Sequence, residues 1–563
     1  MGAIRLRFWS VSIAALACLV FAQHGLAQQS KLGTVDFPTS GRPEAQSYFL
    51  RGLAALHSFW YEEALDNFRL ATKADPDFMM GYWGEAMAYN HPLWAEQDTE
   101  AARKVVAKIH DTPRLTARER GYLKAVRALY GEGDKLTRDK AYCRVMAEVH
   151  RDYPDDMEAD CFYALSLLGT VRPGDKGFSR QMQAGALALE VYRKNPDHPG
   201  AAHYVIHSFD DPEHAILALP AARRYAEIAP AAAHATHMPA HIFLQLGMWP
   251  EAANSNESAW KVSDAWVKSK NLSLSLRDYH SYHWLTYVYL QQGRYRQAED
   301  LLTALSKMVT ESWANGRMSH SYESMAAALV VETERWDQAP KLFKADAKGQ
   351  PDASSGGAHM HSAADAHADA HADAHSASPY QAGGDRLGLY VLGLAAAETG
   401  STTAGEYSER LHGMGKQAST GADAYGAKVA ELMALEIDAE SAAARSDYDS
   451  AIAAMDKALT IENEMSPPSG PPEITKPPRE LYGEIQLRAG HAKLAEALFS
   501  SSLEREPNRA RSLLGLARAA AKAGDAETAA TTYSSFVKMW AQADPECAEL
   551  KEAHTYLQQA GAH

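Results

Sequence analysis

Small, aromatic and proline residues recur along this chain with the spacing of paired helices. From Ala45 onward these positions are Gly52, Ala64, Phe68, Ala71 and Pro76. The same offsets return from about Lys476, at Gly483, Ala495, Phe499 and Pro507. Small residues let two helices cross closely, and proline cannot continue a helix. The pattern therefore predicts two-helix units that repeat at about 34 residues.

Further copies fill most of the chain. Two central copies run through Gly247, Trp249 and Ala252, and through Gly293, Tyr295 and Ala298. A terminal copy runs through Gly524, Ala529 and Tyr533. Weaker copies begin near Met79, Lys124, Met157, Pro199, His320, Arg386 and Leu432. We therefore expect an all-α array in which each unit buries its apolar face against its neighbours.

With several Gly-Tyr-x-x-Ala copies in phase, the chain resembles the tetratricopeptide repeat (TPR) family over most of its length. The resemblance implies a helix-turn-helix solenoid wound as a right-handed superhelix, whose first helices line the concave surface. The N-terminal half also resembles a group of exported bacterial TPR proteins that carry "YWGEAMAYNHPLW" and "HMPAHIF". The spacing is irregular around residues 100–156, and the unit after Ser258 is expanded.

Two segments interrupt the repeats. Residues 349–384 are rich in Ala, Ser, Gly, His and Asp without apolar periodicity, which predicts a disordered insertion. Residues 466–479, "SPPSGPPEITKPPR", predict a stiff extended connector. We thus expect an N-terminal array over 28–348 and a C-terminal array over 385–563.

Residues 1–27 have the pattern of a secretory signal peptide. Arg5 and Arg7 precede an apolar run, and Gly25-Leu26-Ala27 offers a small-residue cleavage site. No later apolar run is long enough to span a bilayer, so no integral span is expected after cleavage. A secreted or periplasmic location follows. An uncleaved anchor is one alternative, and a lipoprotein at Cys18 is weaker because Cys18 lies inside the apolar run.

Composition narrows the class of protein. Hydrophobic residues are 46% and charged residues 23%, as in folded soluble proteins. A net charge of −15 without a basic tract argues against nucleic-acid binding. Four cysteines are too few for a disulfide scaffold. On adjacent helices Cys143 and Cys161 would be offset by about 7 Å along the axis, so buried thiols are favoured over a disulfide.

Histidines carry the clearest chemical signal. Seven of them recur at matching repeat offsets, which the TPR resemblance places on three successive first helices: His203, His207, His234, His237, His241, His280 and His283. His234, His237 and His241 have i, i+3, i+7 spacing, which places them on one helix face. Imidazole suits zinc, copper or nickel. Nearby carboxylates that could act as ligands or orient rings are Asp210, Asp211, Glu213 and Asp278.

Other interpretations of these histidines stay open. They could line a polar groove that binds a partner peptide, or serve packing alone. Pro239 should break the helix locally and widen the groove. His57 and His91, beside Trp60 and Trp94, are better explained as packing or groove residues.

The insertion holds a second group of histidines alternating with aspartates: His359, His361, His367, His371 and His375. On a flexible segment they predict labile, low-specificity metal sites. The alternative is a solvated linker that grew by repetition of a four-residue unit.

Signatures of catalysis are missing from the sequence. It has no G-x-S-x-G, phosphate-loop, G-x-G-x-x-G or H-E-x-x-H motif, and no CxxC pair. We therefore predict a non-enzymatic exported TPR binding or scaffold protein whose groove takes a transition metal or another small ligand. The alternatives are an adaptor for a protein or peptide partner without metal, and a metal-dependent enzyme at the histidine cluster.

Overall fold

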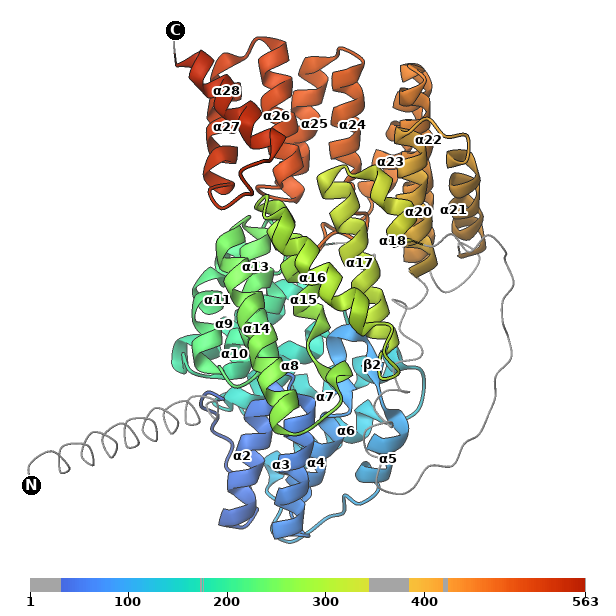
Figure 1. Cartoon of the computed structure of the whole chain (residues 1–563). Coiled ribbons are helices and arrows are strands. Elements are labelled where there is room, and N and C mark those ends of the chain that lie inside the picture. Colours follow the sequence, from blue (N-terminus) through green and yellow to red (C-terminus); the bar gives the residue numbers. More distant parts are fainter. Residues whose placement is uncertain (1–31, 173–174, 176, 344–383, 419–423, 562–563) are drawn as a thin grey trace, which may run out of the picture.

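The computed structural model is an all-α solenoid of antiparallel helix pairs (Figure 1). It describes residues 32–172, 175, 177–343, 384–418 and 424–561. The predicted signal peptide and nearly all of the predicted insertion, including its five histidines, lie outside these ranges. Within them the only strands are β1 (Asn90–His91) and β2 (Glu96–Gln97), which pair antiparallel.

The first array stacks helix against helix in chain order, ending before the predicted insertion. Its helices are α2 (Pro43–His57), α3 (Tyr61–Ala74), α4 (Met79–Met87), η1 (Pro92–Trp94), α5 (Thr99–Val106), α6 (Ala117–Leu129), α7 (Lys135–Asp152), α8 (Met157–Leu168), α9 (Ser179–Lys194), α10 (Pro199–Ser208), α11 (Ala215–Ile228), α12 (Ala233–His237), α13 (Pro239–Gln245), α14 (Trp249–Ser269), η2 (Leu274–Leu276), α15 (Tyr279–Gln291), α16 (Tyr295–Met308), α17 (Gly316–Thr333), η3 (Trp336–Gln338) and α18 (Ala339–Leu342).

The second array follows the same plan. Its helices are α20 (Gly384–Glu398), α21 (Ala404–Ala418), α22 (Ala424–Ala444), α23 (Tyr448–Glu462), α24 (Pro478–Arg488), α25 (Ala492–Arg505), α26 (Ala510–Ala523), α27 (Ala526–Met539) and α28 (Ala548–Ala560). The proline-rich segment between α23 and α24 contains no helix.

The repeat signature is explained by a phenylalanine that packs against two glycines. A Cβ on Gly84 would lie 2.3 Å from the Phe68 ring, and one on Gly52 would lie 3.0 Å from it. In the same way, a Cβ on Gly515 would lie 2.3 Å from the Phe499 ring, and one on Gly483 would lie 2.9 Å from it. The glycines thus let the first helices of successive units approach the ring of the second helix.

The second array docks on the interhelical turns of the first. Gly247 and Gly293 have φ of +63° and +68°, and added Cβ atoms would meet Asn508 and Ala543 at 2.5 and 2.7 Å. The Asp544 amide donates to the Gly293 carbonyl at 2.9 Å. Trp249 Nε1 donates to the Asn508 carbonyl at 2.9 Å. Both turns therefore need glycine for their backbone conformation and for the docking of the second array.

The three cysteines of the described chain form no disulfide. Cys161 and Cys547 are buried thiols, as expected, whereas Cys143 is partly exposed. Within the described ranges, no helix is sufficiently long and apolar to traverse a bilayer.

His412 links α21 to α22 and should make stability depend on pH. Its Nδ1 and Nε2 lie 2.8 Å from Glu431 and 3.0 Å from Asp438. Partial burial lowers its pKa, but the hydrogen bonds to both carboxylates outweigh this and leave the pKa raised. A raised pKa in the folded state stabilises the fold below the unfolded pKa of about 6.5, and this is lost as pH rises through the folded value.

We therefore expect His412→Gln to cost at most about 1 kcal/mol near pH 6 and close to nothing above pH 8. Urea unfolding of wild type and variant at both pH values measures the difference. His554→Gln, at an exposed position, is the control. An equal loss at both pH values would show that the charge of His412 contributes nothing.

Candidate metal centre

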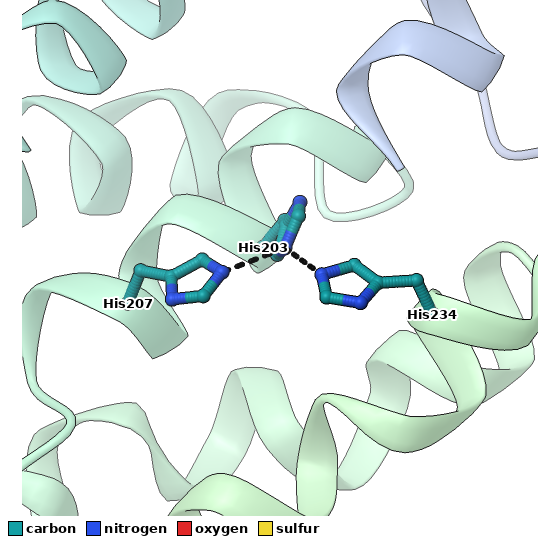
Figure 2. A group of neighbouring side chains, drawn as sticks. All are labelled: His203, His207 and His234. Atoms are coloured by element: carbon teal, nitrogen blue, oxygen red, sulfur yellow. Dashed lines mark hydrogen bonds between the residues drawn. The ribbon is translucent and has the colours of Figure 1, made fainter. Parts of the chain in front are cut away.

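Three histidine side chains from two helices converge in the first array (Figure 2). His203 and His207 lie one turn apart on α10, and His234 comes from α12. The Nε2 of His203 is 3.0 Å from that of His207 and 3.1 Å from that of His234. A ligand atom from each ring lies within 4.8 Å of the others. We call these residues trio A.

The hydrogen bond made by His203 Nδ1 leaves the Nε2 lone pair of the same ring facing His207 and His234. Its Nδ1–H donates to the His57 carbonyl at 2.7 Å, so Nε2 is unprotonated in the neutral ring. One lone pair cannot accept a well-aligned hydrogen bond from both His207 and His234. A tetrahedral ion at about 2.0–2.1 Å from each nitrogen has edges of about 3.3 Å between ligands, close to the observed spacing.

All three rings of trio A favour the neutral form. Burial is the main cause that lowers the pKa of His203, to about 3, against its hydrogen bond to the His57 carbonyl. Burial is the largest cause that lowers the pKa values of His207 and His234 well below the ordinary value, and the neighbouring histidines lower them further. Neutral imidazole is the form that binds a metal ion.

A second group, trio B, lies beside the first and consists of His237, His241 and His280. Their ligand atoms also lie within 4.8 Å of one another. His237 Nδ1 donates to Asn256 at 2.7 Å, while its buried Nε2 has no hydrogen-bond partner among the described residues. Burial lowers the pKa of His237 to about 3. His280 reaches solvent at the edge of the group.

Pro239 decides how these histidines are distributed. As predicted, it interrupts the helix, which is divided into α12 and α13 around Met238. His234, His237 and His241 were expected to share one face. Instead His234 joins trio A, while His237 and His241 join trio B.

The predicted carboxylates fall into different roles. Asp210 accepts from His241 Nδ1 at 2.6 Å, which fixes that ring with Nε2 free. Asp211 accepts from His214, and Asp278 caps α15 through the Ser281 amide. The amide of Glu213 donates to Asp211, and no ligand role is evident for its carboxylate.

His283 stands apart from both trios. His283 is absent from both convergent groups. The titratable neighbour that affects its pKa is His320, which belongs to neither trio. Burial lowers the pKa of His283 to about 3. The structure therefore brings together six of the seven predicted histidines in two sets and leaves His283 outside them.

A third cluster lies beneath trio A and was not predicted. Glu158 on α8 accepts from His57 Nε2 at 2.6 Å and from His198 Nε2 at 3.1 Å. Tyr204 donates to His57 Nδ1 at 2.9 Å, and the Ala201 amide donates to His198 Nδ1 at 3.1 Å. Every ring nitrogen has a partner, so this cluster is a closed polar network that supports His203 through the His57 carbonyl.

The sequence alone indicates a packing or groove role for His57 and gives no sign that His198 belongs to a network. For Glu158 the one local signal is its acidic side chain near the start of the mostly apolar run "MEADCFYALSLL". Burial opposes ionisation of Glu158, but the facing His198 and His57 outweigh it, so its pKa lies well below the ordinary value.

Aromatic side chains enclose both trios. Phe59 packs edge-on against His203 with ring centroids 4.3 Å apart, and Trp94 lies 5.9 Å from His234. Trp284 lies 4.3 Å from His241 and contacts the proline-rich segment, since a Cβ on Gly470 would be 2.4 Å from its ring. These aromatic rings therefore lower the local dielectric constant on one side of the imidazoles, while His280 stays exposed at the edge.

Comparisons with known proteins identify one repeat and add no function. A tetratricopeptide repeat family model matches residues 45–78. No curated protein sequence matches the chain. Among solved structures, yeast Tom70 aligns over 92% of this chain and 89% of its own, at 12% identity and a TM-score of 0.32. A human IFIT1 dimer with PPP-AAAA aligns over 88% and 91%, at 14% identity and a TM-score of 0.34. Values this low assign no ligand.

Proposed function

We propose that this protein is an exported TPR protein that binds a transition-metal ion, with trio A as the principal site. One observation carries the proposal: three imidazole Nε2 atoms, from His203, His207 and His234, converge on one point. Zinc, copper and nickel all accept such donors. Export rests on the predicted signal peptide.

The surroundings of trio A support binding of an ion. Metal-bound histidines commonly donate their second ring nitrogen to a carbonyl or carboxylate, as His203 does to His57. Since the rings are neutral, an ion displaces no proton from His203 Nε2. If these histidines only packed against their neighbours, two ring nitrogens would not need to lie 3.0 and 3.1 Å from a third.

The rival function is a protein-interaction scaffold without metal, the role that the TPR fold suggests. In that case the histidines would only hydrogen-bond a bound peptide. An enzyme is less well supported, because the sequence carries no G-x-S-x-G, phosphate-loop, G-x-G-x-x-G or H-E-x-x-H motif.

The proposal predicts at least about one transition-metal ion per chain in untagged full-length protein purified from its native compartment. The double variant His207→Ala/His234→Ala should lose about one ion. Deletion of residues 349–384 should retain the ion, because the insertion lies outside trio A. His214→Ala, which removes a neighbouring histidine held by Asp211, is the matched control. Elemental analysis measures the content.

The outcomes separate the candidates. Metal lost only with the deletion would assign binding to the insertion and leave trio A to the scaffold function. Absence of metal from all forms, with no uptake of added Zn²⁺ or Cu²⁺, would overturn the proposal.

A further inference from the structure

We infer that the two trios form one dinuclear centre that holds two copper(I) ions, one in each set of three histidines. This inference rests on the proposed function and goes beyond it in the number, identity and arrangement of the ions.

The first argument is that the repeat builds the same site twice. In trio A, two histidines four residues apart on one first helix meet His234 from the next first helix. In trio B, His237 and His241 are likewise four residues apart and meet His280 from the next first helix. His234 and His280 occupy the same position in successive repeats. One geometry is therefore used in two consecutive interfaces.

A third copy of the geometry is not completed. His283 corresponds to His203 and His237, but Tyr287 stands where His207 and His241 stand in the earlier copies. The Tyr287 hydroxyl accepts from Arg509 at 3.0 Å and belongs to a different network. The repeat thus provides two complete histidine trios, and the next unit does not form a third.

The second argument is that the two trios are neighbours. The ring centroids of His207 and His241 are 5.9 Å apart, and those of His234 and His237 are 6.1 Å apart. No side chain has to leave one trio to complete the other. The buried Nε2 of His237 has no hydrogen-bond partner among the described residues, so it gives trio B a lone pair that is available to an ion.

Charge selects the ion. Two divalent ions would bring four positive charges among six imidazoles, all buried or partly buried except His280, and uncompensated buried charge is costly. Two carboxylates are hydrogen-bonded to the trios: Asp210 directly, through His241, and Glu158 indirectly, through His57, whose carbonyl holds His203. Asp278 acts on His280 through its charge alone, and its carboxylate caps α15 through the Ser281 amide. The two hydrogen-bonded carboxylates match two copper(I) ions in charge. Three nitrogen donors also give copper(I) a complete coordination set, and imidazole binds copper well.

The test is an anaerobic titration of the full-length protein lacking residues 349–384 with copper(I) in acetonitrile, against a chromophoric chelator. We expect two ions per chain, each bound at least about 10-fold more weakly after loss of one ligand. His234→Ala and His280→Ala should each leave one tight ion. His283→Ala, at a matched repeat position outside the trios, should leave two. Zn²⁺ should fill one site tightly.

A second measurement does not depend on variants. Copper X-ray absorption of the loaded wild-type protein, with both ions kept as copper(I), should show about three imidazole nitrogens per ion and no sulfur ligand. A sulfur ligand, or clearly fewer than three nitrogens per ion, would overturn the assignment of the two ions to the two trios.

Other outcomes locate the failure. One copper(I) ion, lost in both His234→Ala and His280→Ala, would mean a single shared site and would overturn the inference while the proposed function stands. Two tightly bound Zn²⁺ ions would overturn the selection by charge. Failure to bind any of these ions would defeat the proposed function itself.

Discussion

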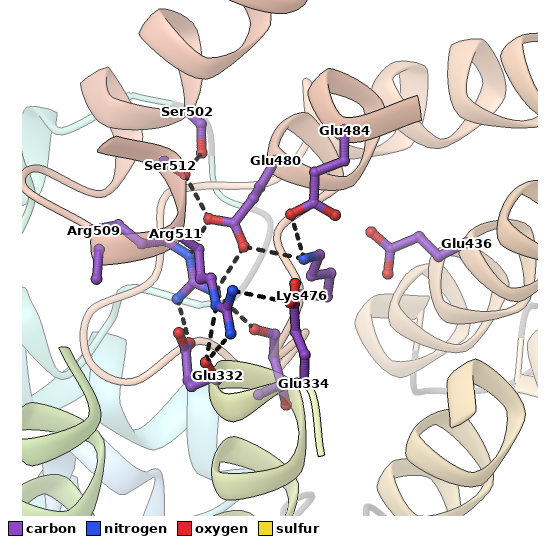
Figure 3. A network of polar contacts seen from close by, with 12 residues as sticks. Glu332, Glu334, Glu436, Lys476, Glu480, Glu484, Ser502, Arg509, Arg511 and Ser512 are labelled. Atoms are coloured by element: carbon purple, nitrogen blue, oxygen red, sulfur yellow. Dashed lines mark hydrogen bonds and ion pairs between the residues drawn. The ribbon is translucent and has the colours of Figure 1, made fainter. Parts of the chain in front are cut away.

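Replacing Arg509 by methionine should lower the free energy of unfolding by about 3–5 kcal/mol. Arg509 is fully buried where the two arrays meet (Figure 3). Its Nε and Nη2 donate to Glu480 at 2.8 and 3.0 Å, and its Nη1 lies 2.8 Å from Glu332 of the first array. Removing the guanidinium takes the buried ion pair from Glu332 and the bidentate partner from Glu480, which keeps only Ser512 and Lys476. Loss of one partner of a buried ion pair is costly because the remaining charge is poorly compensated.

Urea unfolding monitored by circular dichroism measures the effect. Arg518→Met is the matched control, because Arg518 lies on α26 and pairs with Glu552 in a half-exposed bidentate contact. It should cost at most about 1 kcal/mol. Adding Glu480→Leu to Arg509→Met should restore part of the loss, because one stranded carboxylate is then removed. Equal effects of both arginine variants would show that the buried network does not hold the arrays together.

Replacing Glu158 by alanine should cost about 3–5 kcal/mol and also weaken metal binding at trio A. Two buried N–H groups, on His57 and His198, would lose their acceptor. The His57 backbone carbonyl that orients His203 would lose its support, and loss of such outer contacts typically reduces metal affinity about 10–100-fold.

Thermal unfolding and copper(I) or Zn²⁺ titration of the same variant measure both effects. Glu148 lies on α7, next to α8, and its partly exposed carboxylate pairs with Lys124 of α6. Glu148→Ala should therefore change neither by much. If Glu158→Ala unfolds the protein, His198→Ala removes only one of the two donors and tests the link to the trio in a milder form. Unchanged metal affinity in a folded Glu158→Ala protein would contradict the supporting role.

Local sequence patterns determined the repeat class because the relevant contacts lie within one or two units. Gly52, Phe68 and Gly84 are close in the sequence, and their spacing alone predicts helices that cross closely. The break at Pro239 is local as well, since proline removes a hydrogen bond of its own helix. The histidine offsets likewise marked the six residues that converge in two groups.

The tertiary structure decided which histidines meet. Spacing within a helix gives a face but not the distance or rotation of the next helix, so the division of His234 from His237 and His241 could not be derived. The Glu158 network joins residues up to 147 positions apart. The Arg509 network and the docking of Asn508 on Gly247 span more than 200 positions. Such contacts leave no periodic trace, because each depends on how two arrays pack rather than on the geometry of any one helix.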